Sequence, residues 1–240
     1  MNKQRIVVVT GGSKGIGSAI SNAFIRKGDI VWSITRTLPE ADQKCSGLRY
    51  LSADVRDRSS MDLAVDEIKQ KSGTIDVWIN NAGFGKPVGF HDEDNALWEA
   101  IFDVNFWGTV HGTRAALSAL TRPGGNIINI ASTAGMMAPD RHSAYSVSKA
   151  AIIALTRANA VEFSKTGIRV NAIAPGPVDT EGFRAAGGDP QQRAQSIPIR
   201  KMVQPEEVAE ACVFLAESSA SLTGHTLAID GALSAAGCYV

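Results

Sequence analysis

Tyr145 and Lys149 stand four residues apart in the stretch HSAYSVSKAA, residues 142–151. Residues at i and i+4 share one face of a helix, so the phenol and the ammonium can point into the same cleft. A free tyrosine titrates near pH ~10, but a nearby ammonium stabilises the phenolate and lowers the tyrosine pKa toward neutrality. In isolation such a pair would more often be two side chains that reach from a half-buried helix to solvent. With the residues below, it predicts proton transfer by Tyr145.

Two further polar residues occupy positions where a purely structural role is disfavoured. Ser132 ends the strand pattern GNIINIAS, thirteen residues before Tyr145, and parallel sheets bind their ligands at the carboxyl ends of strands. Asn105 lies in FDVNFWG, in the middle of a predicted helix, where a short polar side chain is unfavourable. Asn105, Ser132, Tyr145 and Lys149 are therefore the candidate catalytic residues.

A glycine-rich turn follows the first predicted strand in VVVTGGSKGIGSAI, with Gly11, Gly15 and Gly17 in the pattern TGxxxGxG. Glycines at these positions allow a tight turn and bring backbone N–H groups and a helix N-terminus close to a pyrophosphate. The alternative is that the glycines only permit close packing. Because a predicted strand precedes the turn and a predicted helix follows it, a dinucleotide site is favoured. A Walker A loop is excluded, because Lys14 lies inside the loop and no Lys-Ser/Thr pair follows the last glycine.

The end of the second predicted strand, SITRT, indicates which dinucleotide binds. NAD sites place an acidic residue there to accept hydrogen bonds from the ribose hydroxyls. Here Thr35 and Arg36 take that position, with Lys14 available from the glycine turn. Two cations and a hydroxyl suit a 2′-phosphate, which the planar guanidinium can bind in bidentate fashion. The sequence predicts NADP(H) over NAD(H).

Strand and helix patterns alternate along the chain. Crossovers of this kind imply an α/β fold: a single Rossmann-type domain over residues 1–240, with about seven strands in a doubly wound parallel sheet and helices on both faces. The strand patterns lie at 5–10, 30–35, 48–55, 75–80, 125–132, 168–175 and 226–230. The helical patterns lie at 16–27, 59–71, 95–120, 143–165 and 205–217.

Residues 179–204 form the one long stretch without a clear strand or strong helix pattern. Such a stretch inside a compact domain is either disordered or functional, and we expect a substrate lid over about 180–204.

The composition excludes several other classes of protein. Twenty-four Lys plus Arg balance twenty-four Asp plus Glu, so we expect neither nucleic acid nor an anionic membrane as a partner. The N-terminal apolar run is too short for a signal peptide or a membrane span, which predicts a cytosolic protein. Cys45, Cys212 and Cys238 show no metal-binding or disulfide spacing, so no metal site is expected.

Taken together, TGxxxGxG, NNAG at 80–83, PGPVDT at 175–180 and the four candidate catalytic residues resemble the short-chain dehydrogenase/reductase family, in order and spacing. The resemblance implies that Tyr145 exchanges a proton with the substrate oxygen and that Ser132 hydrogen-bonds that oxygen. It implies that Lys149 binds the nicotinamide ribose and lowers the tyrosine pKa, and that Asn105 holds a water that links the lysine to solvent. The SITRT segment with Lys14 resembles the NADPH-preferring carbonyl reductase branch.

The resemblance also implies a set of cofactor contacts. Asp54 would hydrogen-bond the adenine, with Val55 beside it, and the NNAG segment would line the adenosine side. The PGPVDT segment would pack against the nicotinamide and bind its carboxamide. The full candidate set is Gly11, Lys14, Gly15, Ile16, Gly17, Thr35, Arg36, Asp54, Val55, Asn81, Ala82, Gly83, Tyr145, Lys149, Pro175, Gly176, Val178 and Thr180.

On the substrate side the sequence predicts a mostly apolar wall, suited to a small or medium ketone, quinone or alcohol. Its expected members are Phe84, Met136, Met137, His142 and Phe183, although for His142 a solvated position near a helix start is the favoured interpretation. The small residues along 143–165 allow close helix approach, and the resemblance implies a homotetramer.

Three functions compete at this point. The first is an NADPH-dependent carbonyl reductase that acts on a small molecule. The second is a 3-oxoacyl-thioester reductase whose lid cations, Arg184, Arg193, Arg200 and Lys201, would dock an acyl carrier protein, although solvated side chains are favoured there. The third is a dinucleotide-sensing regulator, for which a proton-transfer tyrosine would have no use.

Overall fold

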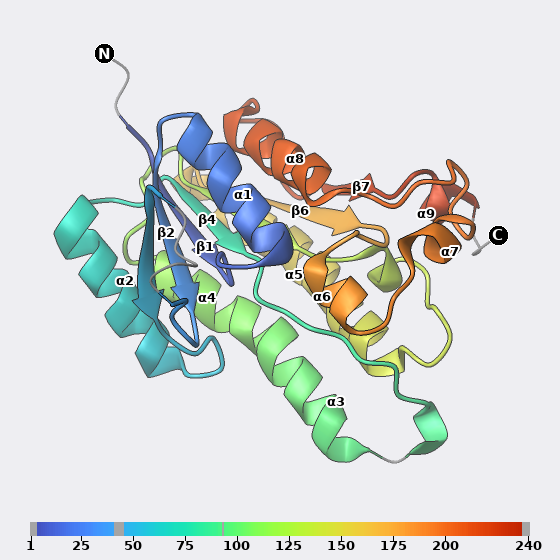
Figure 1. Ribbon diagram of the computed structural model, residues 1–240. Coiled ribbons are helices and arrows are strands. Elements are labelled where there is room, and N and C mark those ends of the chain that lie inside the picture. The colour runs from blue at the N-terminus through green and yellow to red at the C-terminus, as the bar shows by residue number, and fades with distance from the viewer. Residues whose placement is uncertain (1–3, 41–45, 93, 237–240) are drawn as a thin grey trace.

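One parallel sheet organises the structure (Figure 1). The computed structural model describes residues 4–40, 46–92 and 94–236, so Cys45 and Cys238 lie outside the described residues. The sheet order is β3-β2-β1-β4-β5-β6-β7 and every pairing is parallel. The fold prediction is confirmed. The strands are β1 (Ile6–Thr10), β2 (Ile30–Thr35), β3 (Leu48–Ser52), β4 (Val77–Asn80), β5 (Asn126–Ile130), β6 (Arg169–Pro175) and β7 (Thr226–Ile229).

The helices divide between the two faces of the sheet, with α1 and α8 on one face and α2, α4 and α5 on the other (Figure 1). The described helices are α1 (Gly15–Arg26), α2 (Arg58–Ser72), α3 (Asn95–Phe102), α4 (Gly108–Ala116), α5 (Ser143–Phe163), α6 (Glu181–Ala185), α7 (Pro190–Ala194), α8 (Pro205–Glu217) and α9 (Leu233–Ala236).

The first strand shows why the sequence favours this layering. All five of its residues are buried, and alternate side chains point to opposite faces of a strand. Val8 packs with the residues of α2 and α4, whereas Val7 and Val9 pack with those of α1 and α8. A strand covered on both faces needs an apolar residue at every position, and the run of valines provides it.

The order in which strands are added to the sheet changes sides between β1 and β4. The chain passes from β1 outward to β2 and β3, then returns to pair β4 with the other side of β1. In open α/β sheets, the crevice beyond the carboxyl ends of the strands at such a switch point binds the ligand. The glycine turn after Thr10 and the NNAG segment after Ile79 both open into this crevice, because β1 and β4 are in register there.

The predicted helix over 95–120 is wrong in its interior. The chain forms α3, then a π-helical turn at Asp103–Trp107, then α4, which ends at Ala116. Thr109 Oγ1 donates a hydrogen bond to the Asn105 carbonyl at 2.7 Å, four residues back, inside this irregular segment. Single π-turns of this kind often occur at functional sites, and this one carries Asn105.

The stretch 179–204 contains the short helices α6 and α7 rather than continuous coil. Thr180 Oγ1 accepts a hydrogen bond from the Phe183 N–H, and Asp189 caps α7. A bidentate ion pair joins Arg184 to Asp179, with N–O distances of 2.7 and 2.6 Å. These contacts order the segment locally, and a hydrogen bond of 2.9 Å from the Asp179 N–H to the Val203 carbonyl joins its two ends.

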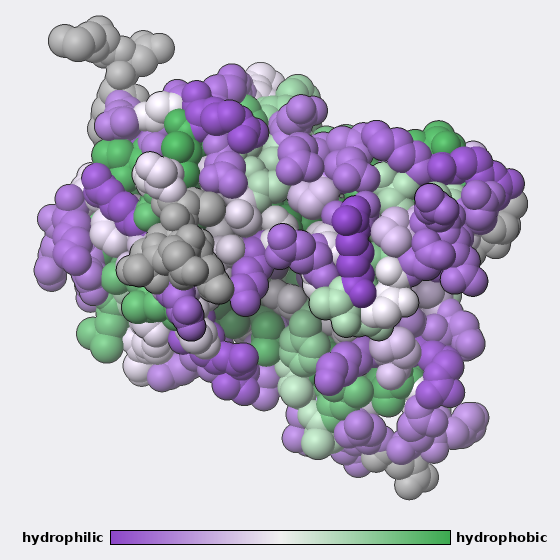
Figure 2. Space-filling view, viewed as in Figure 1, coloured by the Kyte–Doolittle hydropathy of each residue, from purple (hydrophilic) through white to green (hydrophobic). Residues whose placement is uncertain are grey.

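No helix in the described part of the chain is both long and apolar enough to cross a bilayer. Hydrophilic side chains cover most of the face seen in Figure 2, and hydrophobic ones lie between them in several places, including the region of α3.

Candidate active site

The glycine turn adopts a conformation that side chains would prevent. Gly11 and Gly15 have φ of +66° and +51°, in the left-handed region that favours glycine. A Cβ on Gly17 would lie 2.1 Å from the Gly11 carbonyl oxygen, so no other residue fits there. The first helical bond of α1 runs from the Ser18 N–H to the Lys14 carbonyl, which leaves the earlier N–H groups directed at the crevice. This cradle fits the pyrophosphate of a dinucleotide.

Thr10 holds the NNAG segment against the glycine turn. Its Oγ1 accepts hydrogen bonds from the backbone N–H groups of Asn81 and Ala82, both at 3.0 Å. The Asn81 amide Nδ2 in turn donates to the carbonyls of Thr10 and Gly11 at 3.0 and 3.2 Å. The two walls of the crevice are therefore fixed to one another. Thr10 was not among the predicted site residues, although a polar residue at the end of a strand otherwise made of isoleucine and valine was the available signal.

Asn105 joins three elements. Its Oδ1 accepts from the Phe84 N–H at 2.9 Å, and its Nδ2 donates to the Phe84 carbonyl at 3.0 Å and to Ser148 Oγ at 3.1 Å. The side chain is completely buried. It thereby connects the loop after β4, the π-turn and the helix that carries Tyr145 and Lys149.

Ser148, which sequence reasoning did not select, completes this connection. Besides accepting from Asn105, its hydroxyl donates to the Tyr145 carbonyl at 2.7 Å. Ser146, also buried on α5, differs: its hydroxyl has no hydrogen-bond partner among the described residues. Both serines are small residues inside the YxxxK segment, so only the tertiary contacts distinguish them.

Lys149 is buried to 4% exposure, and its Nζ donates to the Ile130 carbonyl at the end of β5 at 2.8 Å. Burial disfavours the charged ammonium and lowers the pKa of Lys149 to about 8. No ion pair involving this lysine occurs among the described residues. A buried lysine without a carboxylate partner is costly to fold, which indicates a functional role.

Tyr145 lies above this ammonium. Lys149 Nζ is 5.7 Å from the centroid of the Tyr145 ring, and the ring packs against Gly85, where a Cβ would come within 2.7 Å of Cδ2. Ser132 follows β5 on the other side, and its Oγ accepts from the Ala134 N–H at 3.1 Å. Because that bond uses a lone pair, the Ser132 hydroxyl proton stays available for a ligand oxygen.

These side chains open into one cavity of about 1040 Å³. Its volume is at the upper end of the range typical of small-molecule and cofactor sites. Of the predicted site residues, the cavity is lined by Gly11, Lys14, Gly15, Ile16, Gly17, Asn81, Ala82, Gly83, Ser132, Tyr145, Lys149, Pro175, Gly176, Val178 and Thr180. Asn105 is buried behind this lining.

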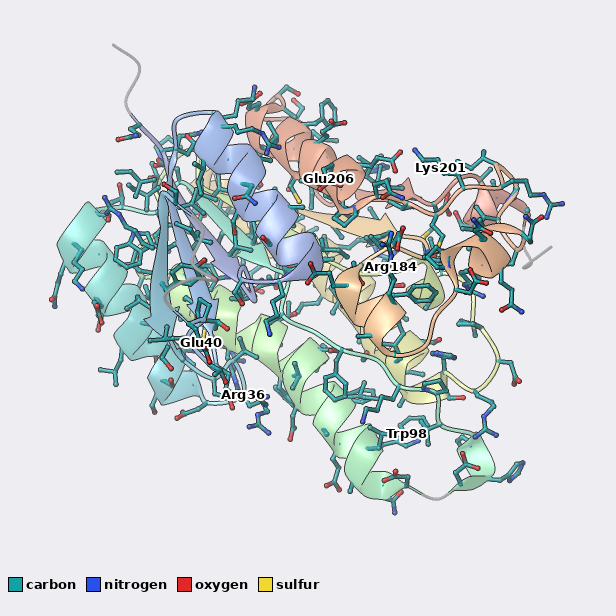
Figure 3. All side chains as sticks on the ribbon, viewed as in Figure 1. Arg36, Glu40, Trp98, Arg184, Lys201 and Glu206 are labelled. Atoms are coloured by element: carbon teal, nitrogen blue, oxygen red, sulfur yellow. The ribbon has the colours of Figure 1, made fainter. Side chains whose placement is uncertain are left out.

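Four predicted cofactor residues do not line the cavity: Thr35, Arg36, Asp54 and Val55. Thr35 is the last residue of β2, Arg36 follows it past the tip of the strand (Figure 3), and Asp54 and Val55 lie beyond the carboxyl end of β3. Asp54 forms a bidentate ion pair with Arg56, whose Nη2 is 2.6 Å from Oδ2. The Arg56 hydrogen bonds, partly offset by burial, hold the pKa of this carboxyl below its usual value, and the charge of Arg36 adds to the effect.

The predicted apolar substrate wall is partly wrong. Phe84 and Phe183 line the cavity, but Met136 and Met137 do not, and Met136 is 51% exposed. The turn at Thr133–Gly135 directs the chain away from the cavity before the methionines are reached. His142, for which the sequence favoured a solvated position, is half-buried and lines the cavity. Sequence reasoning also gave no cavity position to Pro139, Asp140, Pro177, Glu181, Gly182 and Arg193, which line it.

The titratable groups described outside this cavity include one cysteine, Cys212. Burial raises the pKa of the Cys212 thiol on α8, which makes it unreactive. Within the described residues, no group of three or more His, Cys, Asp or Glu side chains could hold a metal ion.

Comparison with known proteins identifies relatives over nearly the whole chain. A family model described as enoyl-(acyl carrier protein) reductase matches residues 11–234. The 2-(S)-hydroxypropyl-CoM dehydrogenase 3 of Xanthobacter autotrophicus is 34% identical over 249 residues, which cover 97% of this chain and 98% of the relative.

Solved structures show the same fold. The aldohexose dehydrogenase of Thermoplasma acidophilum, in ligand-free form, superposes with a TM-score of 0.90 at 30% identity, covering 97% of this chain and 95% of that one. ElxO with NADP bound superposes with a TM-score of 0.90 at 28% identity, covering 97% of this chain and 100% of that one.

Proposed function

The chain belongs to the short-chain dehydrogenase/reductase family, and from this premise we propose that it is an NADP(H)-dependent oxidoreductase that reversibly reduces a ketone to a secondary alcohol. The observation that carries the proposal is the buried, carboxylate-free Lys149 beneath the Tyr145 ring, in one cavity with Ser132 and the glycine turn.

In this proposal each residue has a distinct task. The bound nicotinamide supplies or accepts the hydride. The Ser132 hydroxyl donates a hydrogen bond to the substrate oxygen and orients it. The Tyr145 phenol gives that oxygen its proton during reduction and takes it back during oxidation. Lys149, protonated below pH about 8, stabilises the phenolate.

Preference for the phosphorylated cofactor rests on the cations beyond β2. No acidic side chain follows that strand directly. Arg36 follows its last residue, and Lys14 lies in the glycine turn, so these two cations are the candidates for binding a 2′-phosphate. The pKa effect of Arg36 on Asp54 is consistent with their closeness at this end of the crevice. Binding of NADP in the structural relative ElxO adds support by analogy.

The Arg36→Asp variant tests this preference. We expect its dissociation constant for NADPH to rise about 10- to 100-fold, because a carboxylate repels the phosphate that the guanidinium bound, while that for NADH falls. Fluorescence titration with both cofactors measures the change. Arg114→Asp, at an exposed arginine on α4 outside the cavity lining, is the control for introducing a carboxylate in place of an arginine. Equal affinity of the wild type for NADPH and NADH would contradict the proposal.

Ser148 offers a test of how the catalytic helix is held. In Ser148→Ala, Asn105 and the Tyr145 carbonyl each lose a partner, and we expect kcat to fall about 3- to 10-fold with the NADPH dissociation constant nearly unchanged. Ser146→Ala removes a buried hydroxyl that has no partner and should leave kcat and stability close to wild type. Equal kinetic effects of the two substitutions would show that the hydrogen bonds of Ser148 have no special role.

The decisive experiment measures NADPH oxidation by the purified protein across ketones, quinones, ketosteroids, keto sugars and β-keto thioesters. Turnover on any of these that disappears in Tyr145→Phe supports the proposal. Tight NADPH binding without any turnover would favour the sensor hypothesis instead.

A thioester reductase that docks an acyl carrier protein finds less support. Among the cations considered for that role, Arg184 pairs with Asp179 and Lys201 pairs with Glu207. Such pairs reduce the positive charge available to an acidic carrier. Assembly as a homotetramer, a cytosolic location and closure of the 180–204 segment as a lid stay predictions of this proposal.

A further inference from the structure

His142 is the N-cap residue of α5, one turn before Tyr145, and lines the same cavity. Its Nδ1 lies 2.7 Å from the Asp140 carbonyl oxygen. A carbonyl oxygen only accepts hydrogen bonds, so Nδ1 carries the proton. In the neutral ring, Nε2 is then an acceptor, and no described residue hydrogen-bonds to it.

The backbone that presents this ring is fixed from both sides. The Val88 N–H donates to the Arg141 carbonyl at 2.6 Å, and Arg141 has a φ of +56°, which is unfavourable for a residue with a side chain. An exposed ion pair of 2.8 Å joins Arg141 to Asp92, and Asp92 also accepts from the Gly89 N–H at 2.7 Å. On the other side, the Ser146 N–H donates to the His142 carbonyl at 2.8 Å. The ring of His142 is therefore oriented before any ligand binds.

Other groups on this side of the cavity are also acceptors. The acidic residues Asp140 and Glu181 line it, and Arg193 on α7 is the lining cation beyond the glycine turn and Lys149. Two acidic residues and an imidazole nitrogen without a described partner disfavour an anionic substrate group and favour a hydroxyl, which can donate a hydrogen bond.

We propose that His142 Nε2 accepts a hydrogen bond from a substrate hydroxyl next to the reacting carbon, so that the substrate is a hydroxy ketone in reduction and a vicinal diol in oxidation. This inference rests on the proposed function, because Tyr145 and Ser132 must hold the reacting oxygen one helical turn away.

Matched ketone pairs test the inference: butanone against acetoin, and cyclohexanone against 2-hydroxycyclohexanone. We expect the wild type to favour the hydroxylated member by about tenfold in kcat/KM. His142→Phe keeps an aromatic ring but lacks the acceptor, and should abolish that preference. His142→Gln restores an acceptor oxygen and should recover part of it. His91→Phe, at an exposed histidine that does not line the cavity, is the matched control and should behave as wild type.

The outcomes separate the two proposals. Turnover of both members at equal rates, or a preference that survives in His142→Phe, would overturn the inference and leave the reductase function intact. A strong preference for 2-oxo acids would also overturn it and would point to Arg193 as the specificity residue.

A binding measurement decides the inference even if no ketone is reduced, in which case the proposed function fails. Isothermal titration of the protein–NADP⁺ complex with butane-2,3-diol and with butan-2-ol should show about tenfold tighter binding of the diol, lost in His142→Phe. Equal binding of the two alcohols would refute the role of His142. The chain has four histidines, so ¹⁵N NMR can also verify the protonated Nδ1 directly, and a protonated Nε2 would contradict it.

Discussion

Tyr145→Phe is expected to lower kcat about 10³-fold or more in both reaction directions, with the dissociation constant for NADPH within about twofold of wild type. The substitution removes only the phenolic oxygen, which gives and takes the substrate proton. The ring that packs on Gly85 and lies 5.7 Å from Lys149 Nζ remains. Stopped-flow and steady-state measurements of NADPH oxidation, with a parallel fluorescence titration, separate chemistry from cofactor binding.

Tyr50 provides the control for this experiment. It is a half-buried tyrosine on β3, outside the cavity lining, so Tyr50→Phe should retain near wild-type kcat. If Tyr145→Phe kept wild-type turnover, Tyr145 would not be the proton donor and the whole assignment of the site would fail.

Lys149→Met is expected to have two opposite effects. Activity should fall about 10²- to 10⁴-fold, because the phenolate loses its stabilising charge. The ligand-free protein should become more stable at pH 7, by about 1 to 3 kcal/mol, because methionine fills the buried volume without a charge to desolvate. Chemical denaturation monitored by circular dichroism, together with the NADPH oxidation assay, measures both effects.

The lowered pKa of Lys149 also determines how the stability difference between the wild type and Lys149→Met changes with pH. The unfolded chain binds this proton up to the ordinary lysine pKa of 10.5, whereas the folded chain releases it near 8. The unfolded state thus holds more protons between about pH 8 and 10.5, and the burial cost of Lys149 disappears across that window. The stability advantage of Lys149→Met should therefore shrink as the pH rises from 8 to 10.5. A variant less stable than wild type at pH 7 would contradict the account of Lys149 as an uncompensated buried charge.

If Lys149→Met gains stability and loses activity, Lys149 has a role in the reaction and is not a residue that only stabilises the fold. Arg169 is the useful contrast. It is also a buried cation, but its guanidinium donates to three carbonyls, those of Leu215, Ala216 and Leu222, whereas Lys149 donates to one, that of Ile130. Its replacement would leave those carbonyls without a partner, and such residues are expected to lose stability when changed.

Much of the fold could be read from the sequence because its signals are local. Continuous valines predicted a strand buried on both faces, and the glycine spacing predicted a tight turn that could approach a pyrophosphate. The interruption at Asp103–Trp107 could not be predicted in this way. Residues 95–116 have helical spacing throughout, and the π-turn forms where Asn105 reaches Phe84 and Ser148, residues distant in sequence.

The sequence by itself determined the sheet, the dinucleotide cradle and the four candidate catalytic residues, because each depends on spacing within one or two neighbouring elements. Only the tertiary structure decided how Thr10, Ser148 and His142 contribute. It also excluded Met136 and Met137 from the cavity. Their environments depend on contacts between segments far apart in the chain, such as Val88 with Arg141 and Asn105 with Ser148. The wall of a pocket is made where such segments meet, so residue type alone could not identify it.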